Sequence, residues 1–451
     1  MQSDPVNPGR RNGINRRQAL GGIAAIAAVP ALRPRRSWGQ TPSDELRIAS
    51  VGVGGMGWAD LTSVATAPKV RVVALCDVDD TNLGRAHEQF SSAKTYRDYR
   101  RLLDEMHGEI DAVTVSTPDH MHGSVALAAM GFGKHVYVQK PLAHNLAELR
   151  RMRDVAAEKQ LVTQMGTQIH SHESYRTAAH LLQQGAIGKV REGHLWVGRV
   201  WAGPPEGQPK RGDEVPANLD WNLWLGVAPE RPYVKGLYHP QEWRGWRDFG
   251  TGTLGDMGCH LFDPLFTGLK LKAPIEVISR GPNHREETYS PDCDFTLTFA
   301  GTPHTADRVT FRWTNGSIKP DVAKGQFPSD LKLPGSGSFV VGEKGVMLLP
   351  HWSMPTFYRD GEQLDTPVES VGSVDHYHEW AGACRGEGTT STPFSYACPV
   401  TEAVLVGTLA GNFQDQPLKW NSADLSFDNA AANELVQRKY RDGWQIPGLT
   451  G

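Results

Sequence analysis

The chain has 451 residues and 39% hydrophobic residues, so it is long enough for two domains with separate cores. Its formal net charge of −3 argues against a basic surface for nucleic acid, and no apolar run approaches the ~20 residues of a stable membrane anchor. The five cysteines are scattered without a C-x-x-C pair, which argues against both a disulfide framework and a structural zinc site.

Residues 1–40 have the composition of a targeting segment. Arg16 and Arg17 precede a short stretch rich in glycine and alanine over residues 21–32. Paired arginines before such a stretch resemble a bacterial twin-arginine export signal. An ordinary secretory signal or a basic tail is the alternative interpretation. We therefore expect the mature chain to begin before Thr41 and to be exported to the periplasm.

A glycine-rich stretch, GVGGMG at residues 52–57, lies between a predicted strand at 46–51 and a predicted helix. A second predicted strand, at 70–76, ends at Asp77. This order is typical of a dinucleotide-binding unit, in which glycines permit a tight turn and the helix N-terminus receives the pyrophosphate. The residues predicted to bind the cofactor here are Gly52, Gly54, Gly55, Met56, Gly57 and Asp77.

Asp77 also bears on which dinucleotide is bound. A carboxylate at this position accepts hydrogen bonds from the ribose hydroxyls and repels a 2′-phosphate. We therefore expect NAD rather than NADP, although Arg85 or another basic group could fold over the site.

The alternation of strands and helices continues to about residue 166. Further strands are predicted at residues 110–116, 135–138 and 161–165, with helices at 123–131 and 146–159 and an amphipathic segment at 96–106. Repeated strand–helix pairs require a parallel sheet covered by helices on both faces. We thus predict a Rossmann domain with a doubly wound parallel sheet over residues 44–166.

The remaining residues, 167–451, are predicted to form an α+β domain with a large, mostly antiparallel open sheet. Its predicted strands cover residues 190–200, 275–280, 295–299, 308–313 and 337–341, and its predicted helices cover 375–384, 399–412 and 430–441. The helices of this C-terminal segment could pack back on the Rossmann domain. Two long irregular stretches, 202–243 and 319–335, separate these elements, and the aromatic residues of the first predict a packed lid.

Two His-x-His pairs, at His120/His122 and His376/His378, could each supply half of a metal site. The sequence places no third ligand near either pair. We therefore predict no bound metal.

Four motifs, in order, resemble those of one family. The glycine-rich stretch is followed by STPDHMH at residues 116–122, GKHVYVQKP at 133–141 and GTLGDMGCH at 252–260. Together they resemble the Gfo/Idh/MocA oxidoreductases, the group that includes glucose–fructose oxidoreductase and inositol dehydrogenase. The export-like segment and the run WRGWRDFG at 243–250 are similar to exported members.

The resemblance implies roles for particular residues. Lys140 would lie between the nicotinamide and the reacting carbon, where it polarises the substrate oxygen. Asp256 and His260, which share a helix face at this spacing, would be the catalytic pair, with His260 accepting the hydroxyl proton and Asp256 orienting the imidazole or binding a neighbouring hydroxyl. The cofactor would also contact Ser116, Thr117, Pro118, His122, Gln139 and Lys140, and the substrate would contact Gln168, His170, Trp246 and Arg247.

One motif departs from the family. The usual triplet is Glu-Lys-Pro, and here Gln139 stands in place of the glutamate. The amide can still form hydrogen bonds but lacks the charge that would partner Lys140. The proton state of Lys140 therefore stays open at the level of sequence.

These features predict an exported, NAD-dependent oxidoreductase for a secondary hydroxyl or carbonyl of a sugar, polyol or glycoside, working as a homo-oligomer (dimer or tetramer). An alternative is a glycoside hydrolase or lyase that oxidises the sugar transiently and recycles a tightly bound NAD. A third class, a sugar-binding protein without catalysis, is disfavoured because Lys140, Asp256 and His260 are all present.

Overall fold

The computed structural model describes residues 45–446 and 448–449, all within one compact unit. The segment that predicts export lies outside the described residues. Among the residues described, none of the helices is both long enough and apolar enough to span a bilayer.

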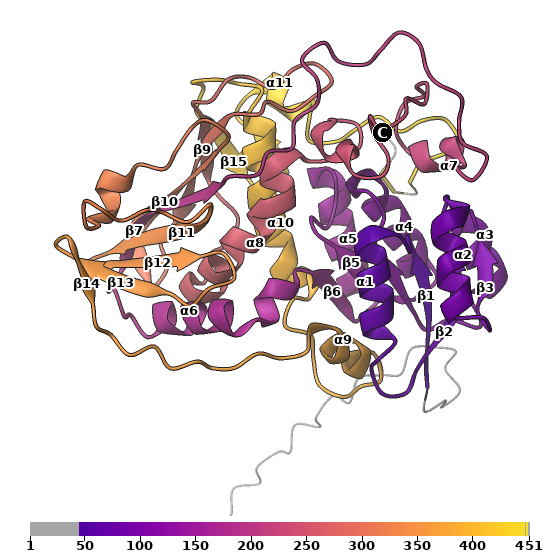
Figure 1. Cartoon of the computed structure of the whole chain (residues 1–451), viewed down its shortest axis with the longest axis horizontal. Coiled ribbons are helices and arrows are strands. Elements are labelled where there is room, and N and C mark those ends of the chain that lie inside the picture. The colour runs from indigo at the N-terminus through magenta and orange to yellow at the C-terminus, as the bar shows by residue number, and fades with distance from the viewer. Residues whose placement is uncertain (1–44, 447, 450–451) are drawn as a thin grey trace, which may run out of the picture. The chain divides into compact units, whose positions relative to one another are not determined.

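The N-terminal part of the described chain forms a six-stranded parallel sheet in the order β3-β2-β1-β4-β5-β6 (Figure 1). Its strands are β1 (Leu46–Val51), β2 (Val70–Cys76), β3 (Lys94–Tyr96), β4 (Ala112–Val115), β5 (His135–Gln139) and β6 (Thr163–Gly166). Its helices are α1 (Gly55–Val64), α2 (Asp80–Gln89), α3 (Tyr99–Met106), α4 (Asp119–Gly131) and α5 (Leu146–Glu158). The strand order reverses between β1 and β4, and ligands of such sheets bind at this switch point.

The remaining, larger part forms a ten-stranded sheet in the order β14-β13-β12-β11-β7-β10-β9-β8-β15-β16. Its strands are β7 (Val190–Val197), β8 (Glu276–Ser279), β9 (Cys293–Ala300), β10 (Thr305–Asn315), β11 (Ser336–Gly342), β12 (Val346–Pro350), β13 (Thr356–Arg359), β14 (Glu362–Leu364), β15 (Leu418–Asn421) and β16 (Ser426–Phe427). Neighbours are antiparallel except β7 and β10, which are parallel. The predicted fold class, a Rossmann sheet followed by an α+β domain with a mostly antiparallel sheet, is confirmed.

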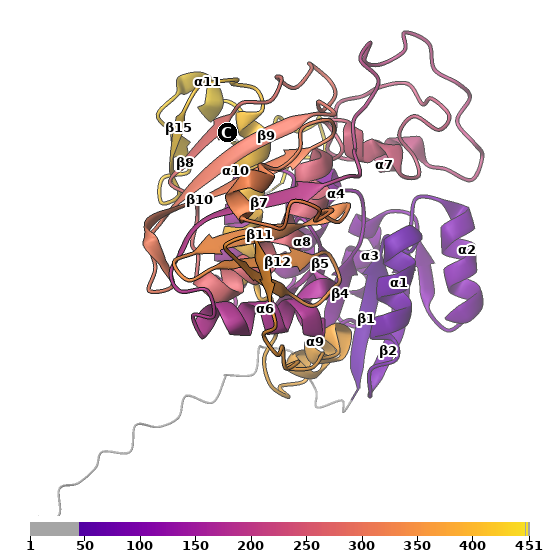
Figure 2. The ribbon, with the colours of Figure 1, turned by 60° about the vertical axis from the view of Figure 1, so that its left-hand side comes forward.

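The helices that follow β6 are η1 (Gln168–Ser171), α6 (Glu173–Gln183), α7 (Trp221–Leu225), η2 (Glu242–Gly245), α8 (Gly252–Leu269), η3 (Val322–Gly325), α9 (His376–Cys384), α10 (Phe394–Ala410) and α11 (Ala430–Asn433). Of these, α8 and α10 lie between the two sheets (Figures 1 and 2). Both α8 and α10 pack on the large sheet, while α10 also contacts α5 and α9 contacts α1. Since α10 is buried along most of its length and touches both layers, it joins the Rossmann sheet to the second sheet.

The long stretch between β7 and α8 is folded over the carboxyl edge of the Rossmann sheet. Its aromatic side chains form their own core, which we call the aromatic cluster and which contains Leu219, Trp224, Leu225, Ala228, Tyr233, Tyr238, Trp243, Trp246 and Phe249. The backbone hydrogen bonds from Asp220 N–H to Val78 O (2.9 Å) and from His120 N–H to Phe249 O (3.1 Å) fasten it to the Rossmann domain. This segment is therefore packed, as its aromatic content predicts, and it also contains α7 and η2.

One expectation about the secondary structure was wrong, and several short strands were not predicted. The helix predicted over residues 430–441 is only the short α11, which ends at Asn433. The residues after it bond α5 instead, because Ala147 N–H donates to Val436 O and the Tyr440 hydroxyl donates to Glu148 Oε1. These contacts fasten the C-terminal segment to the start of α5. The strands from β12 to β16 were not predicted, because they are short and lie towards the edges of the sheet.

Candidate active site

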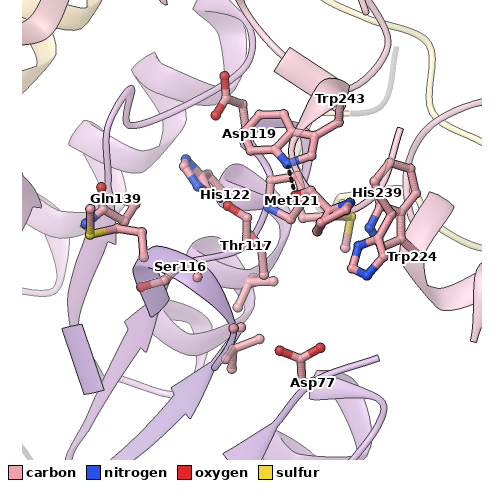
Figure 3. Close-up of a pocket in the computed structure, with 18 of the residues that line it drawn as sticks. Asp77, Ser116, Thr117, Asp119, Met121, His122, Gln139, Trp224, His239 and Trp243 are labelled. Carbon is pink, nitrogen blue, oxygen red and sulfur yellow. Dashed lines mark hydrogen bonds between the residues drawn. The ribbon is translucent and has the colours of Figure 1, made fainter. Parts of the chain in front are cut away.

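A cavity of about 710 Å³ opens at the switch point between β1 and β4, a size typical of ligand and cofactor sites. Figure 3 shows Asp77 and Gln139 on its Rossmann side and Trp224, His239 and Trp243 on the facing wall. Of the residues singled out in the sequence, it is lined by Gly52, Gly54, Gly55, Met56, Asp77, Ser116, Thr117, Pro118, His122, Gln139, Lys140, Gln168, Asp256 and His260. One cavity therefore holds the predicted cofactor and catalytic groups together.

The glycine-rich turn leaves the N-terminus of α1 open to a ligand. Gly52 has φ +79°, and a Cβ there would lie 2.6 Å from Ser116 O. A Cβ on Gly57, which does not line the cavity, would lie 2.0 Å from Gly52 O, so this glycine permits the close packing of helix on strand. The first turn of α1 carries neither an acidic residue nor a capping side chain. Its N–H groups and positive dipole end remain available to a phosphate.

Asp77, at the end of β2, accepts two backbone hydrogen bonds. Its Oδ2 accepts Val53 N–H (2.8 Å) and its Oδ1 accepts Asp79 N–H (2.9 Å), so it holds the glycine-rich turn in place. Burial raises its pKa, and these N–H bonds oppose the rise. Each carboxylate oxygen has a second lone pair for a further donor. The glycine-rich turn and Asp77 thus fit a dinucleotide.

Lys140 and Asp256 form an ion pair at the opposite end of the cavity. Lys140 Nζ donates to Asp256 Oδ1 at 2.7 Å and to Asp256 O at 2.8 Å. Trp201 Nε1 donates to the other oxygen, Oδ2, at 2.6 Å, and Arg244 Nε lies 3.4 Å from Oδ1. Burial favours the neutral acid, but the charges of Lys140 and Arg244 outweigh it and lower the pKa of Asp256. Asp256 is therefore a carboxylate that orients the Lys140 ammonium.

His260 lies one helical turn after Asp256 on α8, on the same face, as the spacing predicts. Its Nδ1 has no hydrogen-bond partner among the described residues. Burial, with the nearby charges of Lys140 and His351, lowers its pKa well below that of a free imidazole. His260 is therefore neutral at pH 7, and Asp256 bonds Lys140 and Trp201 rather than the imidazole.

Gln139 contacts a buried carboxylate that the sequence reasoning missed. Its Nε2 donates to both oxygens of Asp60 on α1, at 2.9 and 3.1 Å, and its Oε1 accepts Lys140 N–H at 3.3 Å. Asp60 is fully buried and also accepts hydrogen bonds from Ser116, Tyr377 and Gln168. The amide is thus matched to Asp60, and the charge beside Lys140 comes from Asp256. Asp60 carried no sequence signal, because its partners lie on four other segments.

Three of the residues expected to contact the substrate do not line this cavity. His170 Nδ1 bonds Asp263 (2.9 Å), Trp246 is 1% exposed within the aromatic cluster, and Arg247 donates to the Arg285 carbonyl (2.8 Å). Figure 3 shows Trp243 of the same run at the cavity wall instead. The structure thus assigns Trp246 and Arg247 to packing, because η2 turns their side chains away from the cavity. The wall at this end is formed by Arg199, Trp201, Trp243 and Arg244.

The two His-x-His pairs bond protein groups. His120 Nε2 contacts Trp224 O, and the two ring nitrogens of His122 lie 2.8 Å from Pro141 O and Thr117 O. His376 bonds Ser171 and Met165, and His378 bonds Thr66. Within residues 45–446 and 448–449, no three metal-binding side chains converge.

A Rossmann sheet with an open glycine-rich turn and a lysine–carboxylate–histidine cluster defines a dinucleotide-binding protein of the oxidoreductase class. Residues 46–167 match the family model described as "oxidoreductase family, NAD-binding Rossmann fold", and residues 187–302 match "oxidoreductase family, C-terminal alpha/beta domain". Together the two matches cover just over half of the sequence. The chain belongs to the Gfo/Idh/MocA family.

Individual relatives are distant. Levoglucosan dehydrogenase of Pseudarthrobacter phenanthrenivorans is 24% identical over 227 residues, 48% of this chain and 50% of that protein. A glycosyl hydrolase family 109 protein of a Shewanella species is 27% identical over 209 residues, 40% of this chain and 45% of that protein. The chain thus matches about half the length of these curated relatives.

Among solved structures, the WlbA dehydrogenase of Bordetella pertussis, in complex with NADH and UDP-GlcNAcA, superposes with a TM-score of 0.59 at 16% identity. The match covers 84% of this chain and 99% of that chain. At this identity the likeness shows the shared fold.

Proposed function

We propose that this protein is an NAD-dependent oxidoreductase that acts on a secondary hydroxyl or carbonyl of a sugar, polyol or glycoside. The observation that carries the proposal is the meeting of Lys140, Asp256 and His260 in the same cavity as the glycine-rich turn and Asp77. Levoglucosan dehydrogenase, whose name states a sugar-derived substrate, supports the substrate class.

The cluster divides the proton chemistry between two side chains. An ammonium has three donors, and Lys140 uses two of them on Asp256, so the third is left to hold the substrate oxygen. His260, which is neutral and lines the cavity, would accept the hydroxyl proton. When bound, the nicotinamide supplies the hydride acceptor for the same carbon. Burial of the cluster keeps water from competing for the proton.

We propose NAD rather than NADP because of Asp77. Asp77 lines the cavity at the end of β2, so it would accept hydrogen bonds from the ribose hydroxyls of a dinucleotide bound at the glycine-rich turn and would repel a 2′-phosphate. Arg85, one of the basic groups that could offset this charge, lies over the Trp58 ring at 4.2 Å and does not line the cavity. Arg97 does line the cavity, and it is paired with Asp80.

We propose further that the chain is exported to the periplasm by the twin-arginine route and acts there as a homo-oligomer. The paired arginines at 16 and 17 support the first part. A route that carries folded proteins would let NAD be bound before export, and the cofactor would then have to be held tightly.

A second candidate function is glycoside hydrolysis or elimination with transient oxidation of the sugar. The Shewanella relative, named as a glycosyl hydrolase, favours it. In this case NAD is regenerated within each cycle and no NADH accumulates. His260 and Lys140 would then carry a proton in both directions on the same sugar.

Mass spectrometry of the purified, denatured protein for NAD(H), followed by a panel of sugars and aryl glycosides, tests both candidates. The oxidoreductase predicts NADH in proportion to oxidised sugar. The glycosidase predicts released aglycone without net NADH. A protein that neither binds a dinucleotide nor turns over any member of the panel would refute both.

A further inference from the structure

The two ends of the cavity differ in charge. At the Asp77 end, Arg97 is paired with Asp80 of α2. At the catalytic end, Lys140, Arg199 and Arg244 line the wall with only two carboxylates, Asp119 and Asp256. The catalytic end therefore carries an excess of positive charge.

Neither carboxylate can balance all three cations. Asp256 is already shared by Lys140 (2.7 Å) and Arg244 (3.4 Å). Asp119 Oδ2 accepts the Thr251 hydroxyl at 2.6 Å, and burial raises the pKa of Asp119. One guanidinium is left without a counter-charge.

That guanidinium is Arg199. No carboxylate of the described residues lies within ion-pair distance of it. Its Cζ lies 4.2 Å from the Trp201 ring centroid, and the same ring donates Nε1–H to Asp256. Arg199, Trp201, Asp256 and Lys140 therefore form one continuous set of contacts from the cavity wall to the catalytic lysine.

Arg244 lies on the same wall. Its Cζ is 4.3 Å from the Trp243 ring centroid and 5.2 Å from that of Trp201. Among the described residues, its polar contacts are from Nε to Asp256 and from one terminal nitrogen to the Gln241 carbonyl. A guanidinium has five donors, so the remaining ones are left for a ligand. Stacking on two indoles holds the plane of Arg244 in place.

We propose that the catalytic end of the cavity binds an anionic substituent on the sugar, a carboxylate or a phosphate ester, through Arg199 and Arg244. The inference rests on the proposed function for its sugar ring. Planar guanidinium groups recognise the oxygens of either anion in a bidentate manner, which a neutral hydroxyl cannot match. The preferred substrate is then a sugar acid or a sugar phosphate.

Isothermal titration calorimetry on the full NAD-loaded chain tests this subsite without relying on turnover. The probes are methyl β-glucoside against methyl β-glucuronide, methyl β-galactoside against methyl β-galacturonide, and glucose against glucose 6-phosphate. We expect at least one acidic probe to bind at least tenfold more tightly than its neutral partner. The uronide and phosphate arms show which anion is accepted. Equal affinities throughout, or binding by no acidic probe, would overturn the proposal.

Arg199→Gln supplies the residue-level test. A hydrogen bond to a charged group is worth enough that affinity for the acidic probe should fall about 10–100-fold, with little change for the neutral one. Arg211→Gln, on an exposed residue of the same loop that does not line the cavity, is the matched control. An equal loss for both probes in Arg199→Gln would contradict anion recognition. Tight acid binding without any hydride transfer would refute the proposed function and leave the subsite standing.

Discussion

The two walls of the cavity are built differently, because a glycine-rich turn after β1 lines the Rossmann side, whereas Trp201, Trp243 and Arg244 of the long β7–α8 segment line the facing side. On the Rossmann wall, Gly52, Gly54, Gly55, Met56 and Asp77 line the cavity as the sequence predicts, and of the glycine-rich residues predicted to bind the cofactor Gly57 does not. On the facing wall, the run around residues 243–250 pointed to Trp246 and Arg247, whereas Trp243 and Arg244 line the cavity. The difference shows that a motif defined by backbone geometry can be recognised in a sequence, whereas the side chains a loop presents depend on its tertiary path.

The largest effect is expected at the catalytic cluster where both walls meet. General acid–base groups typically contribute ~10²–10⁴-fold, so Lys140→Ala and His260→Ala should each lower kcat by about that factor. His260 belongs to α8 of the second domain, so NAD retention should survive its removal. Steady-state kinetics with cofactor content by mass spectrometry measure both quantities. Near-normal turnover by His260→Ala would show that this histidine is not the proton acceptor.

Trp246 and Trp243 offer a direct comparison within the facing wall. Trp246 is 1% exposed, and its ring centroid lies 4.8 Å from that of Tyr238, so Trp246→Ala should cost about 3–5 kcal/mol of unfolding free energy. Its effect on KM, measured on folded protein, should be small. Trp243→Ala should instead raise KM, because Trp243 lines the cavity. Urea denaturation and kinetics on the pair separate the two roles, and the reverse pattern would refute this assignment of the wall.

The fold was predictable because strand–helix alternation and the order of motifs repeat simple periodicities. The pair on α8 was predictable because a spacing of four residues puts Asp256 and His260 on one face. The ion pair of Asp256 with Lys140 could not be predicted in this way, since the two residues are 116 positions apart in sequence. Asp60 was missed for the same reason: a buried carboxylate has no sequence pattern when its donors come from β5, η1, α9 and the residue that follows β4.

The variant Gln139→Glu tests the hydrogen bond between Gln139 and Asp60 on the Rossmann wall, which the sequence did not predict. Sequence comparison alone suggests that the family's glutamate would serve Lys140, but here it would lie beside the buried carboxylate of Asp60. Ionising two adjacent buried carboxylates is unfavourable. We therefore expect the free energy of unfolding to fall by roughly 1–3 kcal/mol at pH 8.

The sign of the pH dependence follows from the proton that the folded pair shares. Repulsion between the two carboxylates favours the state that holds one proton, so the pKa of the pair is higher in the folded protein than in the unfolded chain. The variant therefore regains stability as pH falls and loses it as pH rises. Urea denaturation at pH 5 and pH 8 measures the difference. The double variant Asp60→Asn with Gln139→Glu restores one amide and one carboxylate and should recover most of the loss. A single variant as stable as the parent at pH 8 would contradict the Asp60–Gln139 pairing.

The smallest effect is expected at Asp77. Its carboxylate accepts two backbone N–H groups and would also accept hydrogen bonds from the cofactor. Asp77→Ala removes the acceptor of Val53 N–H and Asp79 N–H, so binding of either dinucleotide should weaken. The ratio of the two affinities isolates the charge, because only NADP carries the 2′-phosphate that Asp77 repels. We expect the preference for NAD over NADP to shrink by roughly tenfold, equivalent to about 1.4 kcal/mol. Fluorescence titration of refolded apoprotein with NADH and NADPH measures both constants. Equal affinity of the parent protein for the two would mean that this wall does not select the cofactor through Asp77.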